Sequence, residues 1–591
     1  MKTMLQELPR CIRSTRAVIW SATILLAANH AAIISSANAQ TIPTDAQATC
    51  TVAPATFKTW FQGGVVKLNG SVLPANSVTF PNTPNCSFYQ WSMQMFLWMT
   101  SPAPVSYGGG GRVFDTSTFF DVSPPDQTGA RSFIPHFPGM IRSLNVRAAQ
   151  AGAAGFPVLF AKGGKLLQVA PAETGPTGKP LIRDRLGNLV EIERSTLDAN
   201  QRPVFMDKAG KTIEHQLAPN ELRIRQAQVQ PSGALVVRKF VINGRPIFID
   251  PFGNVVETEE GQAGDDGVLQ AQTNSLVYYI TMVNDVYAYF LTGVNNNKIS
   301  PGTQFPVSQS DLNKITAFAA ANGRTFTDPN ALAIEVKSAW VEAGNLPNLN
   351  NYITMTATIP TYDQSNPNQW VPNGQKTVEL ALVGIHVVGS TAGHPEMVWA
   401  TFEHFGNAPD ATYTYNSTNG VKTVAQNTAG TWLLTANNSA GPFNTANMQY
   451  QSPNIVAFAG HTISPSDTLR SKAWGAASDV SPNPIDGSAT ASNTEMISIN
   501  HSVSGMMPNG DLRNNYFMTG ATWTIGGAPP NQSNQVGTSQ LANTTMETFQ
   551  QGPDNTVAHG SSNCFDCHVS SSTSISTTAV SHVFKKLKPL F

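Results

Sequence analysis

The chain has 591 residues, with 36 Lys and Arg against 37 Asp and Glu, and only 12% of its residues are charged. So low and balanced a charge argues against a nucleic-acid-binding protein, because phosphate binding needs an excess of Lys and Arg. The 41% hydrophobic content excludes a wholly disordered chain, and the 46 Gly and 40 Pro are typical of turn-rich β structure. We therefore expect a mainly β fold with some helices (α+β), in about two to four domains.

The first 39 residues have the pattern of a secretory signal peptide. Basic residues precede a mainly apolar stretch over 17–34, and Ala37-Asn38-Ala39 provides the small residues at which a signal peptidase cleaves. The mature chain is therefore expected in the periplasm, or secreted. A membrane anchor is the alternative, but Ser21, Asn29 and His30 interrupt the apolar stretch. The basic residues are Lys2, Arg10, Arg13 and Arg16.

The cysteines fall into two pairs once Cys11 has left with the signal peptide. Cys50 and Cys86 are 36 residues apart. In an oxidising compartment they are expected to form a structural disulfide, which would stabilise the fold by roughly 3 to 4 kcal/mol.

The second pair lies in the run Cys564-Phe565-Asp566-Cys567-His568, which has the C-x-x-C-H spacing of covalent c-type haem attachment. Two thiols on one helical turn can each bond to a haem vinyl group, and the adjacent imidazole then ligates the iron. A thioredoxin-like redox pair and half of a zinc site are the alternatives. Neither has the neighbouring strand or the further ligands that it needs. The sequence therefore predicts one haem c.

The export signal together with Cys564-x-x-Cys567-His568 resembles the c-type cytochromes of bacterial periplasms, and the resemblance implies a redox-active haem. It covers the motif alone: 23 residues follow His568 and none is Met, unlike the small cytochrome c domain. The chain is also similar to large bacterial proteins of unassigned function that combine a C-terminal haem motif with two aromatic boxes. The corresponding boxes here are Phe88-Tyr89-Gln90-Trp91 and Trp399-Ala400-Thr401-Phe402-Glu403-His404.

A six-coordinate haem iron needs a ligand opposite His568, and His582 is our first candidate. Met546 and His559 are rivals, and an open position remains possible. If His582 is the ligand, three apolar tail residues are expected to cover the porphyrin, and three lysines would ring its edge as a docking patch for an acidic redox partner protein. The apolar residues are Val583, Phe584 and Leu587, and the lysines are Lys585, Lys586 and Lys588.

Residues 151–262 contain an internal repeat of four copies, each with Pro, two or three apolar residues, and Gly seven positions after the Pro. Each copy predicts a strand, a glycine turn and a second strand, so the region is expected to be an inserted module of β-hairpins. Asp residues in the last three copies are expected to cap the turns, because one Asp per turn cannot supply the roughly six to eight oxygens that calcium needs. The copies are Pro157/Gly164, Pro180/Gly187, Pro203/Gly210 and Pro246/Gly253, with Asp184, Asp207 and Asp250.

The remaining body is predicted from hydrophobic periodicity. Helices are expected over 88–99, over 277–291 and from 310 onward. The 276–291 stretch contains Asn284 and Asp285, so it is expected to be a buried helix and no stable membrane insertion is expected after signal cleavage. Four strands, over 334–337, 352–359, 377–388 and 397–404, are expected to form an antiparallel meander.

Alternation in the last two of these strands places His386 and His404 on inward faces, with His394 in the connecting loop. Together with Glu403 they have the ligand types for zinc, copper or non-haem iron. We favour the alternative that the histidines are hydrogen-bonded core residues, because no closely spaced metal motif is present. A third possibility is that one of them, His404 first, faces the haem.

These observations predict a periplasmic c-type cytochrome that binds one haem c at Cys564, Cys567 and His568 and exchanges electrons with a redox partner protein. Two alternatives stay open: a haem enzyme acting on peroxide or a small organic substrate, and a β-rich binding protein with a sensor or structural haem. The expected parts are the signal peptide over 1–39, the N-terminal part of the β-rich body over 40–150, the hairpin module over 151–262, the main body over 263–540 and the haem attachment segment over 541–591.

Overall fold

The computed structural model describes most of the chain from residue 41 onward, and the predicted signal peptide lies outside the described residues. Strands make up 31% and helices 23%, which confirms the mainly β, α+β class. Within the described part, no helix has both the length and the apolar character needed to cross a membrane. The ranges not described are 1–40, 83–84, 109–110, 125–129, 138, 145–157, 162–164, 198–202, 215–234, 243–244, 250–254, 257–266, 452, 459, 476–487, 531–533, 539–540, 542, 552–563 and 569–575.

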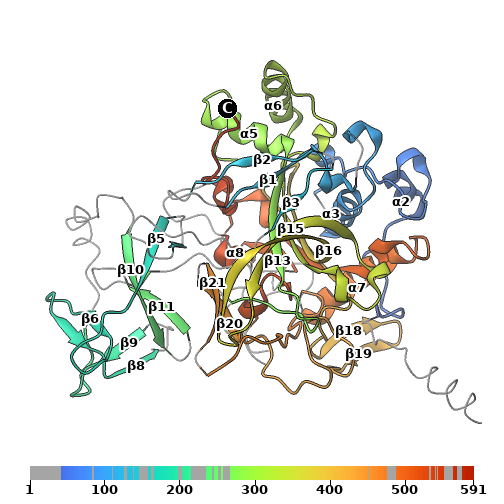
Figure 1. Cartoon of the computed structure of the whole chain (residues 1–591). Helices are drawn as coiled ribbons and strands as arrows, with labels where there is room; N and C mark the ends of the chain where they lie inside the picture. Colours follow the sequence, from blue (N-terminus) through green and yellow to red (C-terminus); the bar gives the residue numbers. More distant parts are fainter. Residues whose placement is uncertain are drawn as a thin grey trace, which may run out of the picture.

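A twelve-stranded sheet forms the centre of the body (Figure 1). Eight strands run side by side in the order β2-β1-β13-β14-β16-β17-β22-β23, and each neighbouring pair is antiparallel. These strands are β2 (Phe133–Pro135), β1 (Phe119–Val122), β13 (Tyr278–Asn284), β14 (Ile334–Glu342), β16 (Gln369–Thr391), β17 (His394–His404), β22 (Tyr516–Thr524) and β23 (Gln535–Gly537); β3 (Arg142–Ser143), β15 (Thr354–Asp363), β20 (Met448–Gln451) and β21 (Asn454–Ala457) join beside them.

The four predicted strands are present, but they do not form a meander in chain order. Strand β14 pairs with β16 and not with β15. The reason is the length of β16, which has 23 residues: its first half pairs with β15 and its second half with β14. The sequence prediction treated β16 as a strand of ordinary length and so missed this double pairing.

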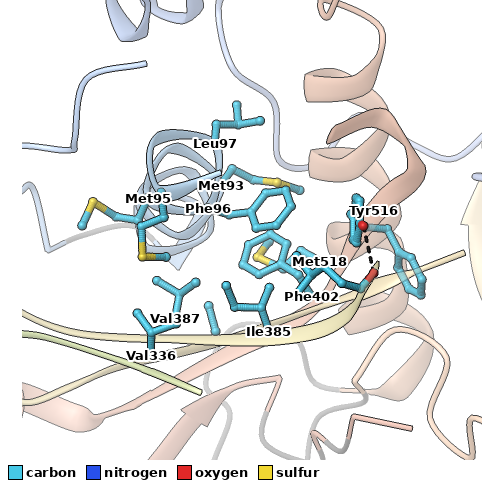
Figure 2. Packing of buried hydrophobic residues seen from close by; sticks show 14 of the residues in the cluster. Met93, Met95, Phe96, Leu97, Val336, Ile385, Val387, Phe402, Tyr516 and Met518 are labelled. Atoms are coloured by element: carbon cyan, nitrogen blue, oxygen red, sulfur yellow. Dashed lines mark hydrogen bonds between the residues drawn. The ribbon is translucent and has the colours of Figure 1, made fainter. Parts of the chain in front are cut away.

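Helix α3 (Asn85–Met99) covers one face of the sheet, as its hydrophobic spacing predicted. Figure 2 shows its side chains packed on residues of β14, β16, β17 and β22. The rings of Phe96 and Phe402 stack with their centroids 4.3 Å apart. The disulfide between Cys50 and Cys86 ties the preceding chain to the start of α3, which confirms that prediction. Helices α2 (Pro54–Trp60) and α7 (Ala489–Ser504) and the hairpin of β18 (Tyr413–Ser417) and β19 (Gly420–Val424) lie elsewhere in the body.

The helix predicted over 277–291 was wrong in its first half. Residues Tyr278–Asn284 form strand β13, and helix α5 covers Asp285–Asn295. The aromatic and β-branched residues before Asn284 favour a strand, and the Asn284 side chain accepts a hydrogen bond from the Tyr287 amide, which is an N-cap. The helix predicted from residue 310 is α6 (Gln309–Ala321), capped by Ser308.

The predicted hairpin repeat forms a five-stranded sheet, two separate two-stranded hairpins and a small core of its own, drawn apart from the large sheet at the left of Figure 1. In the second and third copies, Asp184 and Asp207 each accept two backbone N–H hydrogen bonds across the turn, which confirms the capping role; Asp250 lies outside the described residues. Two features were not predicted: β5 and β10 pair in parallel, and β9 of the third copy pairs with β8, while its expected second strand is a single bridge between Met206 and Thr212. The strands are β4 (Val158–Ala161), β5 (Lys165–Pro171), β6 (Leu181–Arg183), β7 (Leu189–Glu191), β8 (Arg194–Leu197), β9 (Pro203–Met206), β10 (Leu235–Ile242), β11 (Arg245–Ile249) and β12 (Val255–Val256).

Candidate haem attachment site

The two faces of the large sheet carry different residues, and we name them by what covers them. The helix face is covered by α3 and carries apolar residues such as Val387 and Phe402. The tail face is covered by two later parts of the chain, the 543–548 segment and the tail, which we define as the described residues of 564–591. Strand alternation puts Trp399, Thr401 and Glu403 on the tail face, because Phe402 between them points to α3.

The motif cysteines mark the two ends of one helical turn, α8 (Cys564–Cys567). The His568 amide donates to the Cys564 carbonyl oxygen at 2.9 Å, so the turn continues to the histidine. The Phe565 side chain is buried and its ring contacts Trp399 of β17 edge-on at 5.9 Å. The attachment motif is therefore docked on the tail face of the sheet.

The His568 imidazole is held on both sides and by one hydrogen bond. Its ring lies against Trp399 at 4.4 Å and stacks on the His582 ring at 3.9 Å, with 12° between the latter two planes. Its Nδ1 lies 2.7 Å from the Val580 carbonyl oxygen. A carbonyl only accepts, so Nδ1 carries the proton and Nε2 holds a lone pair. Burial, followed by the charge of His582, lowers the pKa of His568 well below that of a free imidazole.

The turn that carries His582 is fixed to the body by Ser581 and Phe584. The Ser581 hydroxyl donates to Glu335 of β14 at 2.6 Å, and Ser581 Oγ also lies 2.8 Å from the Tyr287 hydroxyl. Burial raises the pKa of Glu335. Phe584 packs among aromatic rings of the α5 region, 5.3 Å from Phe305. The short helix η13 (Thr577–Val580) before this turn contacts β17.

The predicted porphyrin cover is not formed by these tail residues. Val583, Phe584 and Leu587 are buried in a cluster with α5 and α6, so their side chains are already in a protein core. Lys585 and Lys588 are exposed beside them. The prediction failed because a run of apolar residues near a cofactor motif can equally well anchor the chain, and spacing cannot distinguish the two uses.

A second polar group lies further along the tail face. His386 Nε2 is 2.8 Å from Glu547 Oε1, and the two side chains are 20% and 29% exposed on a face that is otherwise mostly covered. Lys337 of β14 is the register partner of His386. Thr401, the partner of His386 on β17, is two residues from Trp399, whose ring contacts His568, so this group borders the C-x-x-C-H motif.

The predicted cluster of His386, His394, Glu403 and His404 does not form, and no metal-ligand group of three such residues occurs within the described ranges. His394 pairs with Glu396 at 2.8 Å, while Glu403 pairs with Arg470 at 3.0 Å. His404 lies on the helix face, stacked on Tyr352 at 3.8 Å. The favoured alternative, that His386 and His404 are hydrogen-bonded core or seam histidines, fits: His386 is hydrogen-bonded to Glu547, and Nδ1 of the buried His404 accepts the Gly406 N–H.

The rivals of His582 as second iron ligand lie in different places. The Met546 side chain is buried in a separate cluster. His404 is on the opposite face of the sheet from His568, and burial lowers its pKa to about 3. His559 falls outside the described residues. Of these candidates, the structure places only the His582 ring in contact with His568.

Sequence reasoning missed most of the supporting residues. Glu335 and Lys337 alternate with apolar residues in β14, and charged residues in the middle of a central strand were an available signal. Glu547 and Ser581 gave none, because their partners are distant in sequence. A buried group beside β1 was also missed: His136 lies 2.8 Å from Asp115, and Arg142 bridges Asp115 and Asp121.

These residues fit a covalent haem on the His568 side. The thiol positions share one turn, and a ligating histidine characteristically donates its other ring N–H to a carbonyl or carboxylate, as His568 does to Val580. The position of a second iron ligand, opposite His568, does not fit in this arrangement. The His568 and His582 rings touch face to face, and an iron binds the edge nitrogen of an imidazole, so the stack has to open before His582 can ligate from the opposite side.

Comparison with known proteins adds no identification: the chain matches no protein-family model, no curated protein and no solved structure.

Proposed function

We propose that this chain is an exported monohaem c-type cytochrome that carries one haem covalently at Cys564 and Cys567, with His568 as the first iron ligand. The observation that carries the proposal is the C-x-x-C-H run on one helical turn, with Nδ1 of its histidine bound to the Val580 carbonyl. A bound haem supplies a one-electron couple at the iron. The chain's own residues orient the imidazole: Trp399 and the Val580 carbonyl fix its plane and its tautomer.

Electron exchange with a partner protein is the function that this arrangement supports best. Trp399 and the Val580 carbonyl hold the His568 side of the proposed site against the large sheet, and a fixed first ligand favours electron transfer with little reorganisation. Lys585 and Lys588 are exposed on the tail. We propose that they attract an acidic redox partner, with an association rate that falls as salt rises.

Haem staining of the denatured protein tests the attachment. Wild type expressed with a signal peptide, in a host with a working cytochrome c maturation system, should give a stained band. C564A/C567A should be exported but unstained, because the thioether bonds need both sulfurs. The disulfide variant C50A/C86A is the matched control and should keep the stain. An unstained wild-type band would overturn the proposal.

His582 remains our candidate for the second ligand, and the same preparation tests it. H582A should convert a low-spin haem spectrum to a high-spin one and allow carbon monoxide to bind. H501A is the control, since His501 is exposed on α7. If the H582A spectrum is unchanged, His582 is not a ligand and the attachment proposal stands on the stain alone.

A further inference from the structure

The Glu547–His386 pair has the form of an acid–base group and not of a surface ion pair. A carboxylate is an acceptor only, so the 2.8 Å contact fixes the proton on Nε2 and leaves Nδ1 of His386 as the basic nitrogen. The pair is partly exposed, although His386 lies on a middle strand of the large sheet and Glu547 belongs to the segment that covers it. A histidine oriented by a carboxylate and open to solvent is the arrangement used for positioned proton transfer.

Glu547 is itself held in place by the 543–548 segment. Its second oxygen, Oε2, accepts a hydrogen bond from the backbone N–H of Asn543 at 2.9 Å. The Asn543 side chain in turn donates to Thr401 at 2.9 Å, and the Thr544 amide donates to Glu403 at 2.8 Å. The segment is therefore hydrogen-bonded to β17 on the tail face. Glu547 cannot move away from His386 without breaking these bonds, so the pair is preorganised.

The absence of a side chain at Gly384 allows this close fit. A Cβ at Gly384 would lie 2.3 Å from the Thr545 hydroxyl and 2.8 Å from the Asn543 side-chain oxygen. Real Cβ atoms do not approach that closely, so any larger residue would lift the segment from the sheet. The pair therefore depends on a glycine in the middle of β16, a position where glycine normally weakens a strand.

The pair borders the proposed haem site. His386 shares a register position with Lys337 on one side and Thr401 on the other. The next position on the same face is occupied by Glu335, Val388 and Trp399, and the Trp399 ring contacts His568. Among the described residues, the titratable groups that face this region are Tyr279 from β13, Lys337 and Glu335 from β14, Glu547 from the 543–548 segment, and His568 and His582 from the tail.

From this geometry we propose that His386 is a proton-binding site coupled to the haem, so that electron transfer by the protein is linked to proton uptake. The proposal rests on the function proposed above. A haem held at Cys564, Cys567 and His568 would supply a one-electron couple, and an electron accepted from a donor protein would add one negative charge to the site. Nδ1 of His386 would take one proton from solvent at the same time, and loss of the electron to a partner protein would release that proton. Binding of the electron therefore strengthens binding of the proton, and binding of the proton strengthens binding of the electron to the same extent.

Glu547 is a positioning residue in this scheme. Its carboxylate stabilises the imidazolium form of His386, and removing its charge disfavours that form. Because the electron favours the proton, the reduction potential must fall as pH rises over the range in which this proton is released. In a carrier without such a group, replacing His386 would leave the pH dependence of the reduction potential unchanged.

The test is a spectroelectrochemical titration of the haem-loaded protein between pH 5 and 9. Wild type and the matched control H501N should show a potential that falls with pH. H386N should lose that dependence, and E547Q should move it to lower pH while keeping the side-chain shape. If H386N does not fold, E547Q alone decides.

Each outcome has a separate meaning. An unstained wild-type band defeats the proposed function, whereas a stained protein whose pH dependence is the same in wild type, H386N and E547Q overturns the proton site and leaves the cytochrome intact. Equal shifts in H501N and H386N would also overturn it, because they would show that any surface histidine has this effect.

Discussion

The helix face and the tail face of the large sheet share the same strands but are built differently. Phe402, Glu403 and His404 follow one another on β17 and show the contrast within three residues. Phe402 and His404 point to the helix face, where apolar and aromatic contacts dominate. Glu403 points to the tail face, where it binds Arg470 and the Thr544 amide. The helix face is packed by apolar and aromatic side chains, whereas the tail face combines apolar clusters with polar groups held in defined positions.

Truncation on the helix face should have the largest effect on stability. F402A removes the ring stacked on Phe96 in a closely packed core, so we expect a loss of about 3 to 5 kcal/mol. Urea unfolding followed by tryptophan fluorescence measures it. V421A, at a position that is 66% exposed on β19, is the control and should change stability by less than about 0.5 kcal/mol. A similar loss in both variants would contradict the comparison.

Breaking an ion pair on the tail face should cost somewhat less. E403Q leaves the fully buried Arg470 with Asp410 as its remaining acidic partner, and we expect a loss of about 3 kcal/mol. E379Q replaces an exposed glutamate on neighbouring β16 and should be nearly neutral. If E403Q is as stable as E379Q, the tail face does not depend on its buried charges.

The third effect is a dependence on pH. Burial lowers the pKa of His404 to about 3, whereas an unfolded histidine titrates near 6.5, so the unfolded state binds a proton first as pH falls. Stability is therefore lost below pH 6.5, by about 2 kcal/mol between pH 7 and pH 5. H404Q should lack this contribution, and unfolding curves at the two pH values measure the difference.

This third test compares the pH profile of stability of H404Q with that of wild type, because the total pH dependence of stability includes other groups. Burial raises the pKa of Asp285, Asp328 and Asp410 to about 6, so these groups add stability as pH falls through the same range. They are present in both proteins and cancel. Parallel pH profiles for H404Q and wild type would show that His404 is not held neutral by the fold.

Local features could be predicted from the sequence, and long-range ones could not. The helix α3, the turns at Asp184 and Asp207 and the motif at Cys564 are each defined within a few residues. Strand alternation placed His386 and His404 both on inward faces, but the two residues lie on opposite faces of the sheet. It could not reveal that β16 pairs with both β14 and β15, because pairing depends on contacts between distant segments.

The site divides in the same way. The proposed attachment residues could be identified from the sequence because the C-x-x-C-H spacing by itself predicts haem attachment. The Glu547–His386 pair joins residues 161 positions apart, and Ser581 reaches Glu335 across 246 positions, so no window of sequence contains either contact. The apolar tail residues were visible, but their partner was misassigned: Phe584 packs against Phe305 and other rings near α5.

The order of the chain has a consequence for how the protein matures. Every strand of the large sheet, ending with β23 at Gly537, precedes the 543–548 segment and the tail. In the proposed exported cytochrome the amino end would emerge first, so the sheet would be outside the translocation channel before Cys564 appears. The tail would then close on a surface that already exists, and the proposed haem would be loaded last, on a body whose other folding is complete.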